Sequence, residues 1–217
     1  KLMMIRNYPV TRISVNPQTM NQETLDIIGR RHTVQETEQA FKLARECGFD
    51  NINMDLIVGL PGEDKAMVEH TLEEVRRLAP DSLTVHSLAV KRAARLNMFK
   101  DKYQEMTFEN NQEIMDMTMK TAYEMEMGPY YLYRQKNMKG NFENVGYAKV
   151  DKAGIYNILI MEEKQPIIAL GAGGSSKLVF DHGKRIERVE NVKDVTNYIS
   201  RIDEMIERKR AGIQKWL

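Results

Sequence analysis

The chain has 217 residues, of which 42% are hydrophobic and 29% charged, and its formal net charge is +1. This composition is typical of a globular protein with enough apolar residues for a core, and it argues against intrinsic disorder. The balanced charge would not attract nucleic acid, and no apolar run approaches the roughly 20 residues that span a bilayer. A single cysteine excludes a disulfide framework, so we expect a cytoplasmic protein without nucleic-acid or membrane partners.

The first half of the chain alternates predicted strands and helices. Runs of β-branched and apolar residues predict the strands, and capping residues such as the Thr33/Glu36 pair predict where helices begin. In chain order these are a strand at 11–15, a helix from Asn21 to Arg30, a helix from Thr33 to Gly48, a strand at 51–58, a helix from Asp64 to Pro80 and a strand at 82–88. Such alternation is typical of α/β folds with parallel strands, either in a small open sheet or in part of a larger barrel.

After the third strand the pattern becomes less regular. It continues with a basic loop at 91–106, a helix from Thr107 to Gly128, a strand at 130–133, a polar loop at 137–152, short strands at 155–161, 166–170 and 177–180, a turn at 181–184, a strand at 185–189 and a helix at 192–209. The Asp-His-Gly-Lys turn between two short arms predicts a β-hairpin. We therefore expect an α/β domain at 1–128 and an α+β extension with a terminal helix at 129–217.

Four residues lie where parallel α/β folds place ligand sites, at or near the carboxyl ends of strands. Gln18 follows the first strand, Arg30 ends the next helix, Asp55 lies inside the second strand and Ala89 ends the third. Asp55 has apolar neighbours on both sides, and a carboxylate in such a strand either has a polar partner or faces a ligand pocket. Arg30 could instead interact with the C-terminus of its helix, and Gln18 could be an ordinary loop residue.

Three further features allow more than one interpretation. The glycine-rich loop Gly171–Ser176 could be a plain turn, or it could bind phosphate through backbone amides, as in a phosphate- or sugar-binding α/β enzyme, although it lacks the Lys-Ser/Thr ending of a P-loop. The segment 130–136 places tyrosines beside Arg134 and Lys136, which suits either an aromatic anion or an amphipathic edge strand. The four histidines lack metal-ligand spacing, and among them His86, inside a predicted strand, could line a pocket.

The motifs at 12–19, 29–30 and 51–62 resemble one branch of the radical S-adenosylmethionine superfamily, the oxygen-independent coproporphyrinogen III oxidase and coproporphyrinogen dehydrogenase family. The intervals of 12, 25 and 34 positions that separate Gln18, Arg30, Asp55 and Ala89 are similar to those of this branch. The similarity extends from about residue 8 to residue 180 and includes the Tyr-Tyr-Leu-Tyr-Arg-Gln-Lys-Asn segment that starts at Tyr130. It implies that residues 1–128 form the C-terminal half of a partial (β/α) TIM-like radical SAM barrel and that residues 129–217 form a small α+β C-terminal extension.

The resemblance also implies roles for these residues. Gln18, Arg30 and Asp55 would hold S-adenosylmethionine, and Ala89 would border its adenine. The chemistry is consistent, because a guanidinium suits the ligand's carboxylate while a carboxylate and an amide suit ribose hydroxyls. A tetrapyrrole substrate that carries propionates would contact three residues of the aromatic and basic segment, namely Tyr131, Arg134 and Lys136.

The activity implied by the resemblance is the oxidative decarboxylation of propionate side chains of coproporphyrinogen III to vinyl groups, a step of porphyrin and haem biosynthesis. In such an enzyme a 5′-deoxyadenosyl radical removes hydrogen from the propionate, and carbon dioxide is then lost. The resemblance identifies no catalytic residue in this chain. Haem chaperones share the same motifs, so a relative that binds haem is the alternative within the family.

The chain departs from this family at the iron–sulfur cluster. Family members bind a [4Fe–4S] cluster through the three cysteines of a C-x3-C-x2-C motif, whereas this chain has only Cys47, which we interpret as a core thiol. We therefore expect no metal ligand in this chain, and a cluster only in a full-length protein whose N-terminal half supplies the cysteines. By itself this part should be inactive, and the complete enzyme should need an electron-donor protein.

Overall fold

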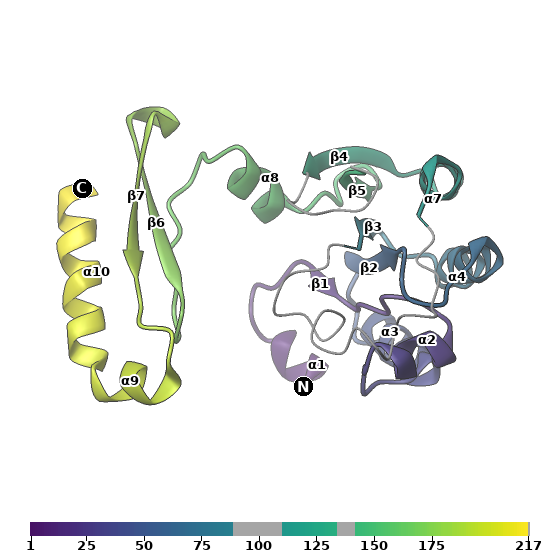
Figure 1. Cartoon of the computed structure of the whole chain (residues 1–217), viewed down its shortest axis with the longest axis horizontal. Helices are drawn as coiled ribbons and strands as arrows, with labels where there is room; N and C mark the ends of the chain where they lie inside the picture. The colour runs from purple at the N-terminus through teal and green to yellow at the C-terminus, as the bar shows by residue number, and fades with distance from the viewer. Residues whose placement is uncertain (89–109, 134–141, 217) are drawn as a thin grey trace. The chain divides into compact units, whose positions relative to one another are not determined.

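The structure, a computed structural model, describes residues 1–88, 110–133 and 142–216. The chain forms two compact units, Lys1–Gly154 and Ile155–Leu217 (Figure 1). Several predictions fall outside the described residues, namely those for Ala89, the loop at 91–106, Thr107, Arg134 and Lys136.

A mixed five-stranded sheet forms the centre of the first unit. Its order is β1 (Ile13–Ser14), β2 (Ile52–Val58), β3 (Ser82–Ser87), β5 (Asn144–Ala148) and β4 (Gly128–Tyr133). The first three strands are parallel, while β5 runs antiparallel to both β3 and β4. The predicted parallel α/β arrangement of the first half is therefore confirmed, and the sheet continues beyond it through two antiparallel strands.

The described part of the first unit contains the helices α1 (Leu2–Ile5), α2 (Gln22–Ile27), α3 (Val34–Glu46), α4 (Lys65–Leu78) and α7 (Gln112–Glu124). The predicted Thr33/Glu36 capping box is present at the start of α3. The Asp64 side chain accepts from the backbone N–H of Met67 and so caps α4, as predicted. The N-cap of α7 is Asn111, whose side chain accepts from the N–H of Ile114.

One face of the sheet carries the hydrophobic core. Alternate residues of β2 point to opposite faces, and Ile52, Met54, Leu56 and Val58 are all almost completely buried. They pack in one cluster with apolar residues of α3, α4 and α7, among them Phe41, Ala44, Leu72, Val75, Ile114 and Ala122. Because the helices cover this face, the intervening residues of β2 and β3 form a second, polar face.

An ion pair with a buried carboxylate and a half-buried guanidinium joins the sheet to α3. The Asp81 carboxylate, in a residue that is 8% exposed, accepts from Arg45 Nη1 at 2.6 Å and from the backbone N–H of Ile52 at 2.8 Å. Arg45 also donates at 2.9 Å to the carbonyl of Ala79, the left-handed residue that ends α4. The end of α3, the start of β2 and the residue that precedes β3 therefore meet at one carboxylate.

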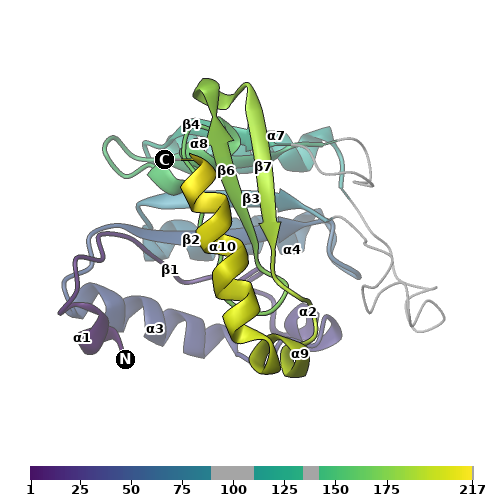
Figure 2. The same ribbon diagram turned by 90° about the vertical axis from the view of Figure 1, so that its left-hand side faces the viewer.

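The second unit contains a two-stranded hairpin and a long helix. The hairpin consists of β6 (Ser175–Phe180), the short turn η2 (Asp181–Gly183) and β7 (Arg185–Glu190), which confirms the predicted turn and arms. The terminal helix is confirmed as well, but it is divided into α9 (Val195–Ser200) and α10 (Ile202–Trp216). Helix α10 runs alongside the hairpin (Figure 2), and Trp216 Nε1 donates to the carbonyl of Val179 at 2.7 Å.

Three predictions of secondary structure are wrong. The segment 137–152, expected to be a polar loop, contains the buried strand β5, whose Asn144 and Gly146 are poor strand formers. Its neighbours β3 and β4 determine its conformation, because strand propensity depends on the packing context. The segment 155–161 is the helix α8 (Ile155–Met161) and not a strand, since a short apolar run has no period that separates the two. The expected strand at 166–170 does not form either, because Ile167 makes only an isolated bridge to Lys177 in this segment.

The division between the two units comes later than the expected domain boundary at 128/129. Strands β4 and β5 pair with β3, so they belong to the first unit, and the chain divides after Gly154. The boundary at 128/129 stays a prediction of where the barrel part of the chain ends. Among the described residues, no helix combines the length and the apolar character needed to cross a membrane.

Candidate functional site

The candidate site lies on the polar face of the five-stranded sheet. Parallel pairing places Asp55 of β2 beside Thr84 of β3, and antiparallel pairing places Gly146 of β5 beside Thr84. Tyr131 of β4 pairs with Gly146 in turn. Polar and aromatic side chains from these strands therefore lie on the face of the sheet opposite the helices. The surface that they form combines residues from four strands.

Asn53 fixes the position of the Asp55 carboxylate. Its Nδ2 donates to Asp55 Oδ1 at 2.6 Å, and its Oδ1 accepts from the hydroxyls of Ser82 and Thr84, both at 3.2 Å. The side chain of Asp55 is 25% exposed. One carboxylate oxygen is thus held by a neighbouring amide, and the group is still accessible from the polar face.

Gln18 is bound directly to β2 next to Asp55. Its backbone N–H donates to the carbonyl of Asp55 at 3.0 Å, and its own carbonyl accepts from the N–H of Ile57 at 2.8 Å. The backbone of Gln18 has a φ of 69°, in the left-handed region. Arg30 Nη2 donates to Gln18 Oε1 at 3.2 Å. The structure therefore brings Gln18 and Arg30 together by their side chains, and it brings Gln18 to Asp55 through the main chain.

A buried carboxylate anchors the loop that carries Gln18. Glu63, which is 2% exposed, accepts from Thr19 Oγ1 at 2.5 Å and from Asn21 Nδ2 at 3.0 Å. Asn21 also donates to Thr71 of α4 and to the backbone carbonyl of Met67. The sequence interpretation assigned Asn21 to a helix cap and missed Glu63, because a residue between a glycine turn and a helix cap gives no periodic signal.

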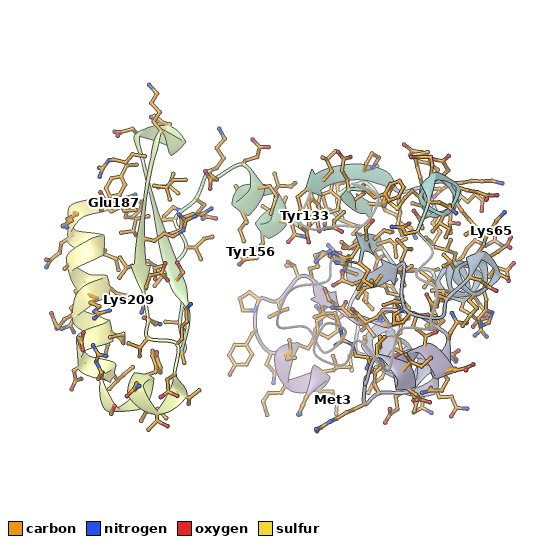
Figure 3. The ribbon with its side chains drawn as sticks, viewed as in Figure 1. Met3, Lys65, Tyr133, Tyr156, Glu187 and Lys209 are labelled. Atoms are coloured by element: carbon orange, nitrogen blue, oxygen red, sulfur yellow. The ribbon has the colours of Figure 1, made fainter. Side chains whose placement is uncertain are left out.

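His86 and Tyr133 extend the polar face beyond Asp55. His86 Nε2 lies 4.0 Å from Asp55 Oδ2, and Tyr133 Oη lies 3.4 Å from His86 Nδ1. Burial lowers the pKa of His86, and the Asp55 carboxylate opposes that shift, so the imidazole is neutral at neutral pH. Tyr133 (labelled in Figure 3) belongs to β4. The structure confirms that His86 lies in a strand, and it places the ring beside the Asp55 carboxylate.

The tyrosines of β4 form an aromatic group on this face. The rings of Tyr131 and Tyr133 are stacked with centroids 6.1 Å apart, and Tyr130 lies 4.8 Å from Tyr131. Burial raises the pKa of Tyr131 to about 12, although a hydrogen bond with Thr84 opposes the shift. Tyr131 therefore stays a neutral hydroxyl across the physiological range and presents both a ring and a polar group to this side of the sheet.

Gly146 makes room for the Tyr131 ring. A Cβ at this position would lie 2.0 Å from Tyr131 Cε1, much closer than two carbons can approach. We expect Gly146→Ala to lower the unfolding free energy of the intact protein by about 1–2 kcal/mol, because the ring must leave its position. Urea denaturation would measure the loss. In the background Tyr131→Ala the same substitution should cost much less, and equal losses in both backgrounds would contradict the contact.

The glycine-rich loop of the second unit uses its own amides. The N–H of Gly173 donates to the carbonyl of Val192 at 2.8 Å, and the N–H of Gly174 donates to the carbonyl of Gly171 at 3.2 Å. Gly171 itself donates to the hydroxyl of Tyr198 at 3.3 Å. Because these donors are already used inside the unit, the loop does not favour the phosphate-binding alternative.

The candidate site does not contain the ligands of an iron–sulfur cluster. Within the described ranges, no three His, Cys, Asp or Glu side chains come together as they would around a metal ion. Cys47 is a free thiol at the C-terminal end of α3 that packs against the core. With one cysteine, the chain cannot supply the three thiolates that hold a [4Fe–4S] cluster, whereas a guanidinium, an amide and a carboxylate suit the polar groups of S-adenosylmethionine.

The chain is similar to proteins of one superfamily. The Radical SAM superfamily profile matches residues 1–75. Over 209 residues the chain is 44% identical to the oxygen-independent coproporphyrinogen-III oxidase-like protein HemZ of Bacillus subtilis, an alignment that covers 96% of this chain and 42% of that protein. It is also 36% identical to the heme chaperone HemW of the same bacterium over 91 residues, which is 42% of this chain and 24% of that protein.

A solved structure shows the same fold. The coproporphyrinogen III oxidase HemN of Escherichia coli, described as a radical SAM enzyme, matches with a TM-score of 0.67 at 20% identity, over 94% of this chain and 45% of that one. The chain spans less than half the length of each of these three relatives. The α/β architecture with its parallel strands therefore corresponds to part of a radical SAM fold. From the profile and the related sequences, we conclude that the chain belongs to the radical S-adenosylmethionine superfamily, in which it is similar to oxygen-independent coproporphyrinogen-III oxidase-like proteins and to heme chaperones.

Proposed function

We propose that this chain supplies part of an S-adenosylmethionine site in a longer radical enzyme. Gln18, Arg30 and Asp55 would hold the cofactor, and Ala89, outside the described residues, would border the adenine. The observation that carries the proposal is the meeting of Gln18 with Arg30 at 3.2 Å and with the backbone of Asp55 at 3.0 Å. These residues are far apart in the sequence, and their chemistry matches a ligand that carries both a carboxylate and a ribose.

Each residue has a distinct task in this proposal. The planar guanidinium of Arg30 would bind the ligand's carboxylate, and its bond to Gln18 restricts where it points. The carboxylate of Asp55 would accept hydrogen bonds from the ribose, while Asn53 keeps it oriented. Bound S-adenosylmethionine would supply the radical chemistry together with a [4Fe–4S] cluster. The cysteines for that cluster would come from the N-terminal half of the same protein, and the electron from a donor protein.

The proposed substrate is a tetrapyrrole with propionate side chains. The tyrosines on the polar face offer aromatic surfaces for a flat macrocycle, and Tyr131 contributes a neutral hydroxyl. Arg134 and Lys136, outside the described residues, would add cations for the propionates. The complete enzyme would then act as a coproporphyrinogen III oxidase or dehydrogenase that converts propionates to vinyl groups, and this part alone would be inactive.

The second candidate is a haem-binding chaperone built on the same fold. It is supported by the 36% identity to a heme chaperone over 91 residues. Anaerobic assays of the intact protein with reductant and S-adenosylmethionine distinguish the two. Decarboxylation of coproporphyrinogen III would support the enzyme, whereas stable haem binding without turnover would support the chaperone. Failure to bind S-adenosylmethionine would exclude both.

The role of Arg30 can be tested by removing either the guanidinium of the protein or the carboxylate of the ligand. We expect Arg30→Ala in the intact protein to weaken S-adenosylmethionine binding by about 1–2 kcal/mol, because a charged hydrogen bond to the carboxylate is lost from an exposed side chain. Binding of 5′-methylthioadenosine, which lacks that carboxylate, should be unchanged. Isothermal titration calorimetry measures both ligands.

The neighbouring exposed Arg31 provides a matched control. Arg31→Ala removes the same charge from the adjacent position, so it should leave the affinity for both ligands unchanged. If Arg30→Ala weakens the two ligands equally, or weakens neither, Arg30 does not bind the carboxylate.

A further inference from the structure

His86 occupies a position beside Asp55 for which neither the resemblance nor the proposed cofactor site provides a role. It comes from β3, while its two polar neighbours come from β2 and β4. Asp55 Oδ2 lies 4.0 Å from Nε2, and Tyr133 Oη lies 3.4 Å from Nδ1. The side chains of His86 and Asp55 are 28% and 25% exposed, so a ligand on the polar face can reach both.

The surroundings of the ring favour one tautomer. A neutral imidazole has one nitrogen that donates and one that accepts. If the Tyr133 hydroxyl donates to Nδ1, the ring proton lies on Nε2 and points toward the Asp55 carboxylate. Burial keeps the pKa of His86 below its ordinary value, so the ring approaches Asp55 as a neutral N–H donor. Among the described residues, the titratable groups beside the ring are Asp55 from β2 and Tyr133 from β4.

The Asp55 carboxylate can accept more hydrogen bonds than Asn53 supplies, so it can also accept one from His86 Nε2–H. A carboxylate has about four lone-pair directions, two on each oxygen. Asn53 Nδ2 uses one of them on Oδ1 at 2.6 Å. A donor from His86 would use one on Oδ2, and one direction would then remain on each oxygen. Two acceptors side by side match the two neighbouring hydroxyls of a ribose.

We infer that His86 is a positioning residue, whose Nε2–H holds Asp55 Oδ2 so that the carboxylate accepts both ribose hydroxyls of S-adenosylmethionine. The inference rests on the proposed role of Asp55 in binding that cofactor. The present separation of 4.0 Å exceeds a hydrogen bond, and a small side-chain rotation on ligand binding closes it. Tyr133 acts one step further away, because its hydroxyl selects the tautomer that donates to Asp55.

Two substitutions at His86 separate the donor from the shape of the ring. His86→Phe keeps a flat ring of similar size but has no N–H, whereas His86→Gln keeps an amide N–H at about the position of Nε2. In the intact, cluster-loaded protein we expect His86→Phe to raise the dissociation constant of S-adenosylmethionine about fivefold to tenfold, which is the effect of one hydrogen bond. His86→Gln should stay within about twofold of the wild type. His70→Gln, at an exposed position of α4, is the control and should match the wild type.

A ligand without ribose hydroxyls tests how His86 acts. The 2′,3′-dideoxy analogue of S-adenosylmethionine should bind the wild type much more weakly than the natural ligand does. In His86→Phe that penalty should shrink, because the carboxylate is no longer held for the diol. An equal penalty in the wild type and in His86→Phe would mean that His86 has only a structural role, and this result would overturn the inference.

The same titrations keep this inference separate from the proposed function. If Asp55→Ala loses affinity while His86→Phe binds both ligands like the wild type, the role of His86 is refuted and the cofactor site stands. If Asp55→Ala binds S-adenosylmethionine as tightly as the wild type, the proposed cofactor site itself fails. Circular dichroism of each variant confirms that a loss of affinity does not result from unfolding.

Discussion

Replacing Asp55 by alanine in the intact protein is expected to weaken S-adenosylmethionine binding by about 2–3 kcal/mol, or about 30- to 150-fold in affinity. The substitution removes both proposed acceptors of the ribose hydroxyls at a position that is only 25% exposed. It also leaves Asn53 Nδ2 without the acceptor that it now reaches at 2.6 Å. Isothermal titration calorimetry under anaerobic conditions measures the affinity.

Asp55→Asn refines this test, because it keeps the shape of the side chain and one carbonyl acceptor. We expect its loss of affinity to be about half that of Asp55→Ala. The control is Asp116→Ala, which removes an exposed carboxylate of α7 that accepts from Gln112. This variant should bind like the wild type. Wild-type affinity in Asp55→Ala would contradict the assignment of Asp55 to the ribose.

The largest expected effect on stability is at Asp81. We expect Asp81→Ala to lower the unfolding free energy by about 3 kcal/mol, because the buried N–H of Ile52 loses its acceptor and Arg45 loses its carboxylate. The estimate is below the full cost of breaking a buried pair because the Arg45 side chain is 32% exposed and remains partly hydrated. Urea denaturation of the intact protein, followed by circular dichroism, measures the change.

Two further variants make the Asp81 prediction specific. Asp81→Asn keeps one oxygen that can accept from Ile52 and should cost roughly half as much. Asp50 pairs with Lys152 at 3.1 Å, but its side chain is 83% exposed, so Asp50→Ala should leave the denaturation midpoint unchanged. A loss at Asp81 no greater than that at Asp50 would mean that the buried carboxylate does not hold the three segments together.

Local sequence signals determined much of the first unit. The Thr33/Glu36 capping box and the Asp64 cap both form as predicted, because each depends on residues only three positions apart. The strand around Asp55 was also evident, since a run of apolar residues before a glycine turn is a local pattern. In contrast, β5 was missed because its five residues become a strand only between β3 and β4.

The candidate site, too, was predicted from the sequence only in part. The sequence pointed to Gln18 after a predicted strand, Arg30 at a predicted helix end and Asp55 within a predicted strand, and a family resemblance supported all three. The bond between Arg30 and Gln18, and the backbone pairing of Gln18 on β2, became visible only in three dimensions. Glu63 was missed altogether, although it accepts hydrogen bonds from Thr19 and Asn21 in the loop that carries Gln18. Both partners lie more than 40 positions away in the sequence.

The sequence by itself determined the alternating α/β pattern, the helix caps, the hairpin of the second unit and the absence of a cysteine motif for a cluster. Each of these depends on residue identities within a short window, where backbone geometry and hydrogen bonding act locally. Only the tertiary structure decided that Asp55, His86 and Tyr133 share one face of the sheet, and that Asn53 and Glu63 hold the groups around them. Strand pairing brings these side chains together, and pairing between distant strands is set by the packing of the whole sheet.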